Sequence, residues 1–208
     1  MSEEFRSGFA CLVGRPNAGK STLTNAMVGR KVAITSARPQ TTRRVLRGIV
    51  NRPEGQLVMV DTPGLHRPRT LLGERLNDQV RETWSSVDVV GLCIPADQEV
   101  GPGDRYISTE LTSLRRTPIV AVVTKTDSVS KQTVAERLAE VSALAEETGL
   151  PWADVVPVSA RTGDNVELLI QQLIARLPEG PVLFPEGEDE AETIEIAIAE
   201  LIREAALE

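Results

Sequence analysis

Apolar and polar positions follow two different periods along this chain. Six short apolar runs have the length of strands, and they cover residues 9–13, 45–50, 56–60, 88–94, 119–123 and 155–158. Apolar residues at helical spacing fall within residues 22–28, 103–116, 134–145 and 164–177. Because strands alternate with helices over most of the chain, the pattern predicts a mostly parallel sheet with helices on both faces.

One strand of this sheet is expected to run antiparallel. The turn residues Asn51–Gly55 join the apolar run at 45–50 directly to the run at 56–60, which is the spacing of a hairpin. Asp164 and Glu167 have the spacing of a capping box, so we expect Asp164 to cap the helix that follows. The whole pattern predicts a three-layer α/β fold built on a six-stranded sheet.

A boundary falls at residues 178–190, where three prolines, two glycines and a run of carboxylates gather. A helical period with one apolar face returns over residues 192–208. We expect residues 1–178 to form one domain. Residues 179–208 would form an acidic linker and a helix, which either packs back on the domain or opens a second one.

Composition narrows the class of protein further. The formal net charge of -7 argues against a strong nucleic-acid-binding surface on these residues alone, although residues 30–47 are locally basic. Cys11 and Cys93 each lie in an apolar run and are predicted to be buried thiols. The N-terminus lacks the order of a signal peptide, and no apolar run reaches membrane-spanning length, so we expect a cytoplasmic protein.

The most informative stretch is Gly14–Ser21, which matches the phosphate-loop pattern G-x-x-x-x-G-K-S/T. It follows a predicted strand and runs into a predicted helix, the context that separates a true phosphate loop from a chance match. The two glycines allow backbone angles and close approaches that point N–H groups at phosphate oxygens, and the helix N-terminus adds its positive end. Lys20 would reach the β- and γ-phosphates, and the Ser21 hydroxyl would bind Mg²⁺.

A second motif, Asp61-Thr62-Pro63-Gly64, comes directly after the predicted strand at 56–60. A carboxylate at the end of that strand is suited to hold Mg²⁺, directly or through water. The N–H of Gly64 would bind the γ-phosphate. The loop after it could therefore respond to whether that phosphate is present.

Two further stretches predict the identity of the base. Thr124–Asp127 follows the strand at 119–123, and Ser159-Ala160 follows the strand at 155–158. The Asp127 carboxylate can accept from the guanine N1–H and amine together, a pattern that adenine does not present. Lys125 would lie along the base, and a backbone N–H at 159–160 would meet the guanine carbonyl. We therefore expect guanine rather than adenine.

Four stretches together, Gly14–Ser21, Ile34–Arg43, Asp61–His66 and Val158–Gly163, resemble the Era family of ribosome-assembly GTPases. The phrase T-S-x-x-P-Q-T-T-R within the second stretch is the most specific part, and the resemblance covers about residues 5–178. It implies a Ras-like P-loop fold, hydrolysis of GTP to GDP and phosphate with Mg²⁺, and partners in 16S rRNA and the small ribosomal subunit. It leaves open a role for K⁺ and a peripheral association with membranes. We expect a monomer.

The chain also departs from that family in two places. Thr124 stands where the family more often has Asn; its hydroxyl can still brace the phosphate loop, so we expect guanine selectivity to persist. Residues 199–205 resemble the opening helix of the family's KH-type RNA-binding domain, but the domain itself is missing from these 208 residues. Arg38, Arg43, Arg44 and Arg47 could meet RNA phosphate, or could equally be solvated basic residues.

The resemblance places Thr41 and Thr42 in a switch loop that closes on Mg²⁺. Thr42 is the favoured ligand, Thr41 is the second choice, and the alternative is two threonines in a polar loop. Leu65 follows Gly64 where Ras-like enzymes have the Gln that orients water. Because Leu has no donor or acceptor, slow intrinsic hydrolysis is expected.

Asn17 would place K⁺ beside the phosphates, as in similar GTPases, or would serve only as a turn residue. His66, the single histidine, is a general base or an exposed switch residue.

These arguments define three sets of candidate site residues. The catalytic set is Lys20, Thr42 and Gly64. The metal set is Ser21, Thr42 and Asp61. The nucleotide set is Asn17, Ala18, Gly19, Lys20, Ser21, Thr22, Thr124, Lys125, Asp127, Ser159 and Ala160.

Three functions fit these candidate residues. The first is a GTP-hydrolysing switch in small-subunit assembly and rRNA maturation. The second is a GTP-dependent binding module with negligible hydrolysis. The third is the GTPase domain of a tRNA-modifying or membrane-transport protein, which the Pro39-Gln40 phrase disfavours.

Overall fold

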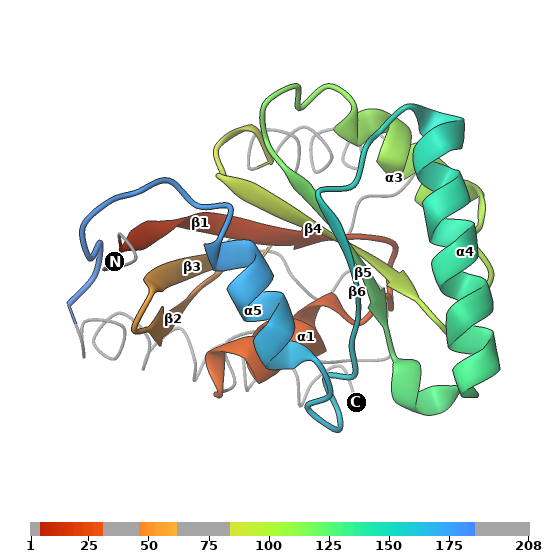
Figure 1. Ribbon diagram of the computed structural model, residues 1–208, viewed down its shortest axis with the longest axis horizontal. Coiled ribbons are helices and arrows are strands. Elements are labelled where there is room, and N and C mark those ends of the chain that lie inside the picture. Colours follow the sequence, from red (N-terminus) through yellow and green to blue (C-terminus); the bar gives the residue numbers. More distant parts are fainter. Residues whose placement is uncertain (1–4, 31–45, 62–83, 186–208) are drawn as a thin grey trace, which may run out of the picture.

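The computed structural model describes residues 5–30, 46–61 and 84–185 (Figure 1). Its centre is a six-stranded sheet in the spatial order β2-β3-β1-β4-β5-β6. In chain order these strands are β1 (Arg6–Val13), β2 (Leu46–Arg52), β3 (Gly55–Asp61), β4 (Val89–Pro95), β5 (Ile119–Thr124) and β6 (Asp154–Pro157). The predicted number of strands is confirmed.

One pair in the sheet is antiparallel, and all the others are parallel. β2 pairs with β3 from Leu46↔Asp61 to Arg52↔Gly55, which closes the predicted hairpin. β1 lies between β3 and β4 and is parallel to both. The mostly parallel sheet with one antiparallel strand is therefore confirmed.

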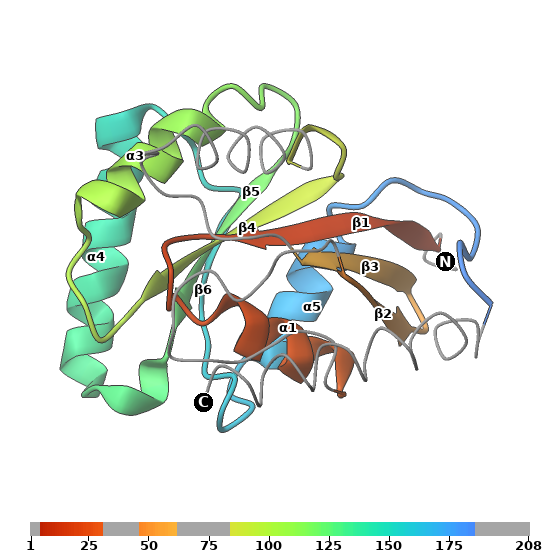
Figure 2. The same ribbon diagram turned by 180° about the vertical axis from the view of Figure 1, so that it is seen from behind.

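Helices cover both faces of the sheet. The helices are α1 (Lys20–Val28), α3 (Pro102–Leu111), α4 (Lys131–Thr148) and α5 (Val166–Ile174), with a 3-10 turn at Thr126–Ser128. Side chains of α1 and α5 form one core cluster with the sheet, and those of α3 and α4 form the other. Figures 1 and 2 show these two helix layers on opposite sides of the strands. The three-layer α/β prediction is confirmed.

Burial along the central strands explains why they read as continuous apolar runs. Every residue of β4 and of β5 is buried, because helices cover a parallel sheet on both faces. Cys11 and Cys93 are buried thiols on β1 and β4, as predicted.

The start of α5 differs from the prediction. Asn165, not Asp164, is the N-cap, and it has a left-handed backbone with φ 58°. Its side chain makes no cap hydrogen bond; its amide instead donates to the Pro157 carbonyl at 2.9 Å. Glu167 does not complete a capping box either, because its carboxylate pairs with Arg52 on β2 at 2.8 and 2.7 Å.

The chain beyond α5 runs back along the sheet up to residue 184. The Gln56 side chain on β3 is almost fully buried and accepts from the Leu183 and Phe184 N–H groups at 2.8 and 3.0 Å. The Ser7 hydroxyl donates to the Pro181 carbonyl at 2.6 Å. The predicted helix at 192–208 lies outside the described residues, so the division at residue 178 stays a prediction. Within the described ranges, no helix is long and apolar enough to span a bilayer.

Candidate functional site

Most of the predicted site residues that the structure describes follow the carboxyl ends of parallel strands. β1 leads into the loop at 14–19, β5 into Lys125, and β6 into Ser159. Because the carboxyl ends of parallel strands meet at one edge of a sheet, these side chains gather there. β3 brings Asp61 to the same edge, since Cys11 of β1 is paired in register with Val60.

The two glycines of the phosphate loop serve different needs. A Cβ on Gly14 would lie 2.5 Å from the Cys93 carbonyl oxygen, so no larger residue fits between the loop and β4. Gly19 has φ 88° and is the N-cap of α1, a conformation that glycine adopts without strain. Asn17 also has a left-handed backbone, with φ 62°, and lies in a turn of the loop; its role beside K⁺ stays a prediction.

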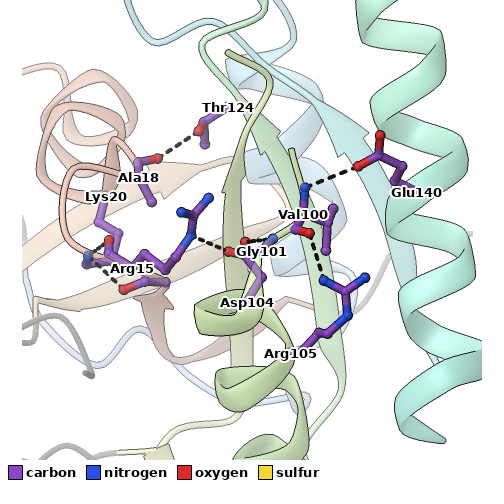
Figure 3. Close-up of polar contacts among 10 residues, drawn as sticks. Arg15, Ala18, Lys20, Val100, Gly101, Asp104, Arg105, Thr124 and Glu140 are labelled. Atoms are coloured by element: carbon purple, nitrogen blue, oxygen red, sulfur yellow. Dashed lines mark hydrogen bonds and ion pairs between the residues drawn. The ribbon is translucent and has the colours of Figure 1, made fainter. Parts of the chain in front are cut away.

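The Lys20 ammonium points back into the loop. Its Nζ donates to the carbonyls of Gly14 and Arg15 at 3.0 and 2.9 Å, and only 8% of the residue is exposed (Figure 3). These two backbone carbonyls hold the Lys20 ammonium inside the loop. A buried ammonium in that position supplies positive charge to an anion bound by the loop.

Thr124 holds the phosphate loop from the end of β5. Its hydroxyl donates to the Ala18 carbonyl at 2.7 Å, and both residues are buried (Figure 3). The sequence-based prediction that Thr124 can brace the loop in place of Asn is confirmed. The contact joins the phosphate-binding loop to the segment predicted to read the base.

Asp127 lies next to that brace with its carboxylate held at both oxygens. Oδ1 accepts from the Ser159 hydroxyl at 2.6 Å, and Oδ2 pairs with the Arg161 Nε at 2.7 Å. The Ser159 hydrogen bond is the main cause that lowers the pKa of Asp127, and the charge of Arg161 lowers it further. An ionised carboxylate, with up to four lone-pair sites, is the group that can accept from two adjacent N–H donors of guanine.

Lys125 has a left-handed backbone with φ 59°, and its Nζ pairs with Asp97 at 3.1 Å. This contact joins the segments after β4 and β5. Ala160 is half-buried beside α5, Ser21 is half-buried in the first turn of α1, and Thr22 is exposed there.

Several predicted residues lie outside the described ranges. They are Arg38, Thr41, Thr42, Arg43, Arg44, Gly64, Leu65 and His66. Asp61 and Arg47 are described only as backbone positions in β3 and β2. Their predicted roles stay predictions.

The structure adds three side chains that the sequence reasoning did not place at this site. Arg161 follows Ser159-Ala160 directly, so its nearness to Asp127 could have been inferred from the motif. Arg15 and Asp104 form an ion pair at 2.8 Å between the phosphate loop and α3, in which Asp104 is buried and Arg15 is half-buried. They are 89 residues apart in sequence, and no local pattern joins them.

Comparison with known proteins agrees with this geometry. The family model described as 50S ribosome-binding GTPase matches residues 9–125, more than half of the chain. GTPase Era of Streptomyces coelicolor is 62% identical over 203 residues, which cover 98% of this chain. The chain spans 64% of that relative's length.

Two solved structures of Era proteins have a similar fold. An Aquifex aeolicus Era variant bound to GDP.AlF4- has a TM-score of 0.86 and 31% identity, covering 97% of this chain and 67% of that one. Era in complex with MgGDPNP and a segment of 16S ribosomal RNA has a TM-score of 0.80 and 31% identity, covering 88% of this chain and 61% of that one.

The fold and the site thus define a Ras-like domain of the P-loop GTPase class. Within that class, the chain belongs to the Era family of GTPases. The resemblance carried by the four sequence motifs is confirmed.

Proposed function

We propose that this chain is a switch that binds and hydrolyses GTP, with output in small ribosomal subunit assembly and rRNA maturation. One observation carries the nucleotide part. Thr124 bonds directly to the Ala18 carbonyl of the phosphate loop, three residues before Asp127 and its pairing with Ser159. A single ligand with phosphates at one end and guanine at the other would span the two parts.

The phosphates would lie in the loop Gly14–Ser21. There the Lys20 ammonium supplies positive charge, and the first N–H groups of α1 add to it because a helix offers them no acceptor of its own. The base would lie against Asp127, whose lowered pKa leaves the carboxylate ionised well below neutral pH. Lys125 and Ala160 would lie beside the base. Asn17 and Thr22 would lie beside the phosphates.

The residues present suit a magnesium ion beside the phosphates. Ser21 offers a half-buried hydroxyl at the first turn of α1, and the register of β1 with β3 brings Asp61 to the same edge. Oxygen donors of this kind suit Mg²⁺, and Thr42 would complete the set. When bound, the ion would neutralise charge on the β- and γ-phosphates. One solved Era relative is in complex with MgGDPNP, which supports this assignment.

Hydrolysis would be slow without a partner. Gly64 would donate its N–H to the γ-phosphate, but Leu65 offers no group to orient water. Within this chain, the Lys20 ammonium would then stabilise the negative charge that develops on the phosphates during hydrolysis. Because Leu65 is apolar, a GTP-dependent binding module with negligible hydrolysis is the second candidate.

The ribosomal part rests on the relatives. One solved Era relative is in complex with 16S ribosomal RNA. The chain carries a formal net charge of -7, so RNA binding would depend on the basic stretch at 30–47 and on parts that the longer relatives have in addition.

A multiple-turnover phosphate-release assay tests this function. We would compare wild type with Lys20→Ala, in Na⁺ and in K⁺, with and without small ribosomal subunits. Release by wild type that Lys20→Ala lacks, and that subunits accelerate, is the expected result. If tight GTP binding occurs with no release above the variant in any condition, the binding-module function replaces hydrolysis.

A further inference from the structure

The Arg15 side chain leaves the phosphate loop and packs against α3. Its Nε donates to the Asp104 Oδ1 at 2.8 Å, and the Asp104 side chain is fully buried (Figure 3). Figure 3 shows the guanidinium of Arg15 pointing away from Lys20 and toward the start of α3. A residue of the phosphate loop is thus anchored by a helix that carries none of the sequence motifs.

The anchor allows Arg15 little freedom. The second carboxylate oxygen of Asp104 accepts from the Gly101 N–H at 2.9 Å, so the carboxylate itself is fixed. The Arg15 stem lies on Gly103, where an added Cβ would be 2.7 Å from the Arg15 Cδ. The side chain of Arg15 therefore has one well-defined place.

The backbone of Arg15 connects its ion pair with Asp104 to the Lys20 ammonium. Its carbonyl accepts from the Lys20 Nζ at 2.9 Å and from the Ala18 N–H at 3.2 Å. Any shift of Arg15 moves one of the two acceptors that hold the Lys20 ammonium. The loop is thus held at two points, by Thr124 at Ala18 and by Asp104 at Arg15.

The start of α3 is itself tied to α4. The Val100 N–H donates to the Glu140 carboxylate at 3.1 Å, and the Arg105 Nη1 donates to the Val100 carbonyl at 2.7 Å (Figure 3). Asp104 therefore sits on a turn that is fixed from both sides.

We infer that Asp104 is a positioning residue for phosphate binding: it fixes Arg15, whose carbonyl holds the Lys20 ammonium in place. This inference rests on the proposed function, since it requires a phosphate in the loop. A purely stabilising pair is the competing explanation, and one atom weighs against it. The Arg15 Nη2 is buried and has no hydrogen-bond partner among the described residues, and its desolvation cost reduces what the pair can add to stability.

Asp104→Asn gives the direct test. The amide oxygen can still accept from the Gly101 N–H, but the ion pair with Arg15 is lost. GDP and GMP affinities of the 208-residue chain would be measured by titration, because only GDP carries the β-phosphate that Lys20 reaches. We expect GDP to bind roughly 10-fold more weakly, as misplaced groups commonly cost, with GMP changed less than about 2-fold. Equal losses for both ligands, or an unchanged GDP affinity, would overturn the inference.

Gly103→Ala approaches the same contact from the other side. The new methyl group displaces the Arg15 stem while the ion-pair partners remain, and alanine favours the helix. The variant should lose GDP affinity relative to GMP; unchanged relative affinity contradicts the inference even if Asp104→Asn does not fold. Glu147→Gln is the matched control, because it removes the Arg105–Glu147 ion pair between α3 and α4. If the wild-type protein itself binds no GDP, the proposed function is contradicted, and not only the role of Asp104.

Discussion

The Ser159 hydroxyl donates a 2.6 Å hydrogen bond to the Asp127 carboxylate across 32 residues of sequence. Ser159 follows β6, and Asp127 lies in the 3-10 turn after β5. The parallel register of these two strands brings the two loops together. The contact sets both the orientation and the charge of the group proposed to read guanine.

Removing that hydroxyl should change the titration of Asp127. In Ser159→Ala we expect the pKa of Asp127 to rise, because the hydrogen bond is the largest cause that lowers it. Arg161→Ala should also raise the pKa of Asp127, because the charge and the hydrogen bond of Arg161 both lower it. The measurement is an NMR titration of the Asp127 carboxylate in the three proteins. An Asp127 pKa that does not rise in Ser159→Ala would contradict the account.

The same shift has a consequence for stability. Because the folded pKa of Asp127 lies below its ordinary value of 3.8, the group stabilises the fold above that pH. This stabilisation is lost as pH falls through the folded pKa. In Ser159→Ala, the unfolding free energy should therefore depend less steeply on pH below about 3.8.

The brace at Thr124 predicts a loss of nucleotide affinity. Thr124→Val keeps the shape and removes the hydroxyl, which leaves the buried Ala18 carbonyl without this donor. We expect GDP to bind about 5- to 10-fold more weakly and the unfolding free energy to fall by about 1 kcal/mol. Thr124→Ser and Thr124→Asn keep a donor and serve as controls. If the Thr124→Val and Thr124→Ser variants bind GDP with equal affinity, the hydrogen bond from Thr124 to Ala18 has no role in nucleotide binding.

The Arg52–Glu167 pair should contribute little to stability. It joins β2 to α5 through two hydrogen bonds of 2.8 and 2.7 Å, but its side chains are 31% and 53% exposed. Glu167→Gln should lower the unfolding free energy by about 0.5–1 kcal/mol at pH 7. The pair lowers the pKa of Glu167 below 4.5, so its contribution is present above that pH and lost as pH falls. Denaturant unfolding at pH 7 and at a series of lower pH values checks both points, and an effect that does not shrink as the pH falls would contradict them.

The sequence predicted the parts of the fold that local pattern controls. Strands such as β4 are apolar throughout because both faces are buried, and a glycine such as Gly14 is required where the loop touches β4. The candidate residues follow strand ends, so a parallel sheet was enough to place Lys20 and Asp127 at one edge.

Other features depend on contacts between distant segments. Asp164 has the right spacing for a cap, but Asn165 takes that place because its amide reaches the Pro157 carbonyl. Arg15 and Asp104 carry no shared pattern, since only the packing of α3 against the loop makes them partners. Such pairings follow from the three-dimensional fold rather than from periodicity or motif.

The most direct test of the central claim is binding of labelled GDP, with ATP and xanthosine diphosphate as competitors, to wild type and Asp127→Asn. We expect tight GDP binding that ATP does not displace. In Asp127→Asn, binding should weaken for GDP and shift toward the xanthine nucleotide, because the amide offers one acceptor and one donor where the carboxylate offers two acceptors. Equal competition by ATP in wild type would contradict guanine recognition, and with it the proposed function.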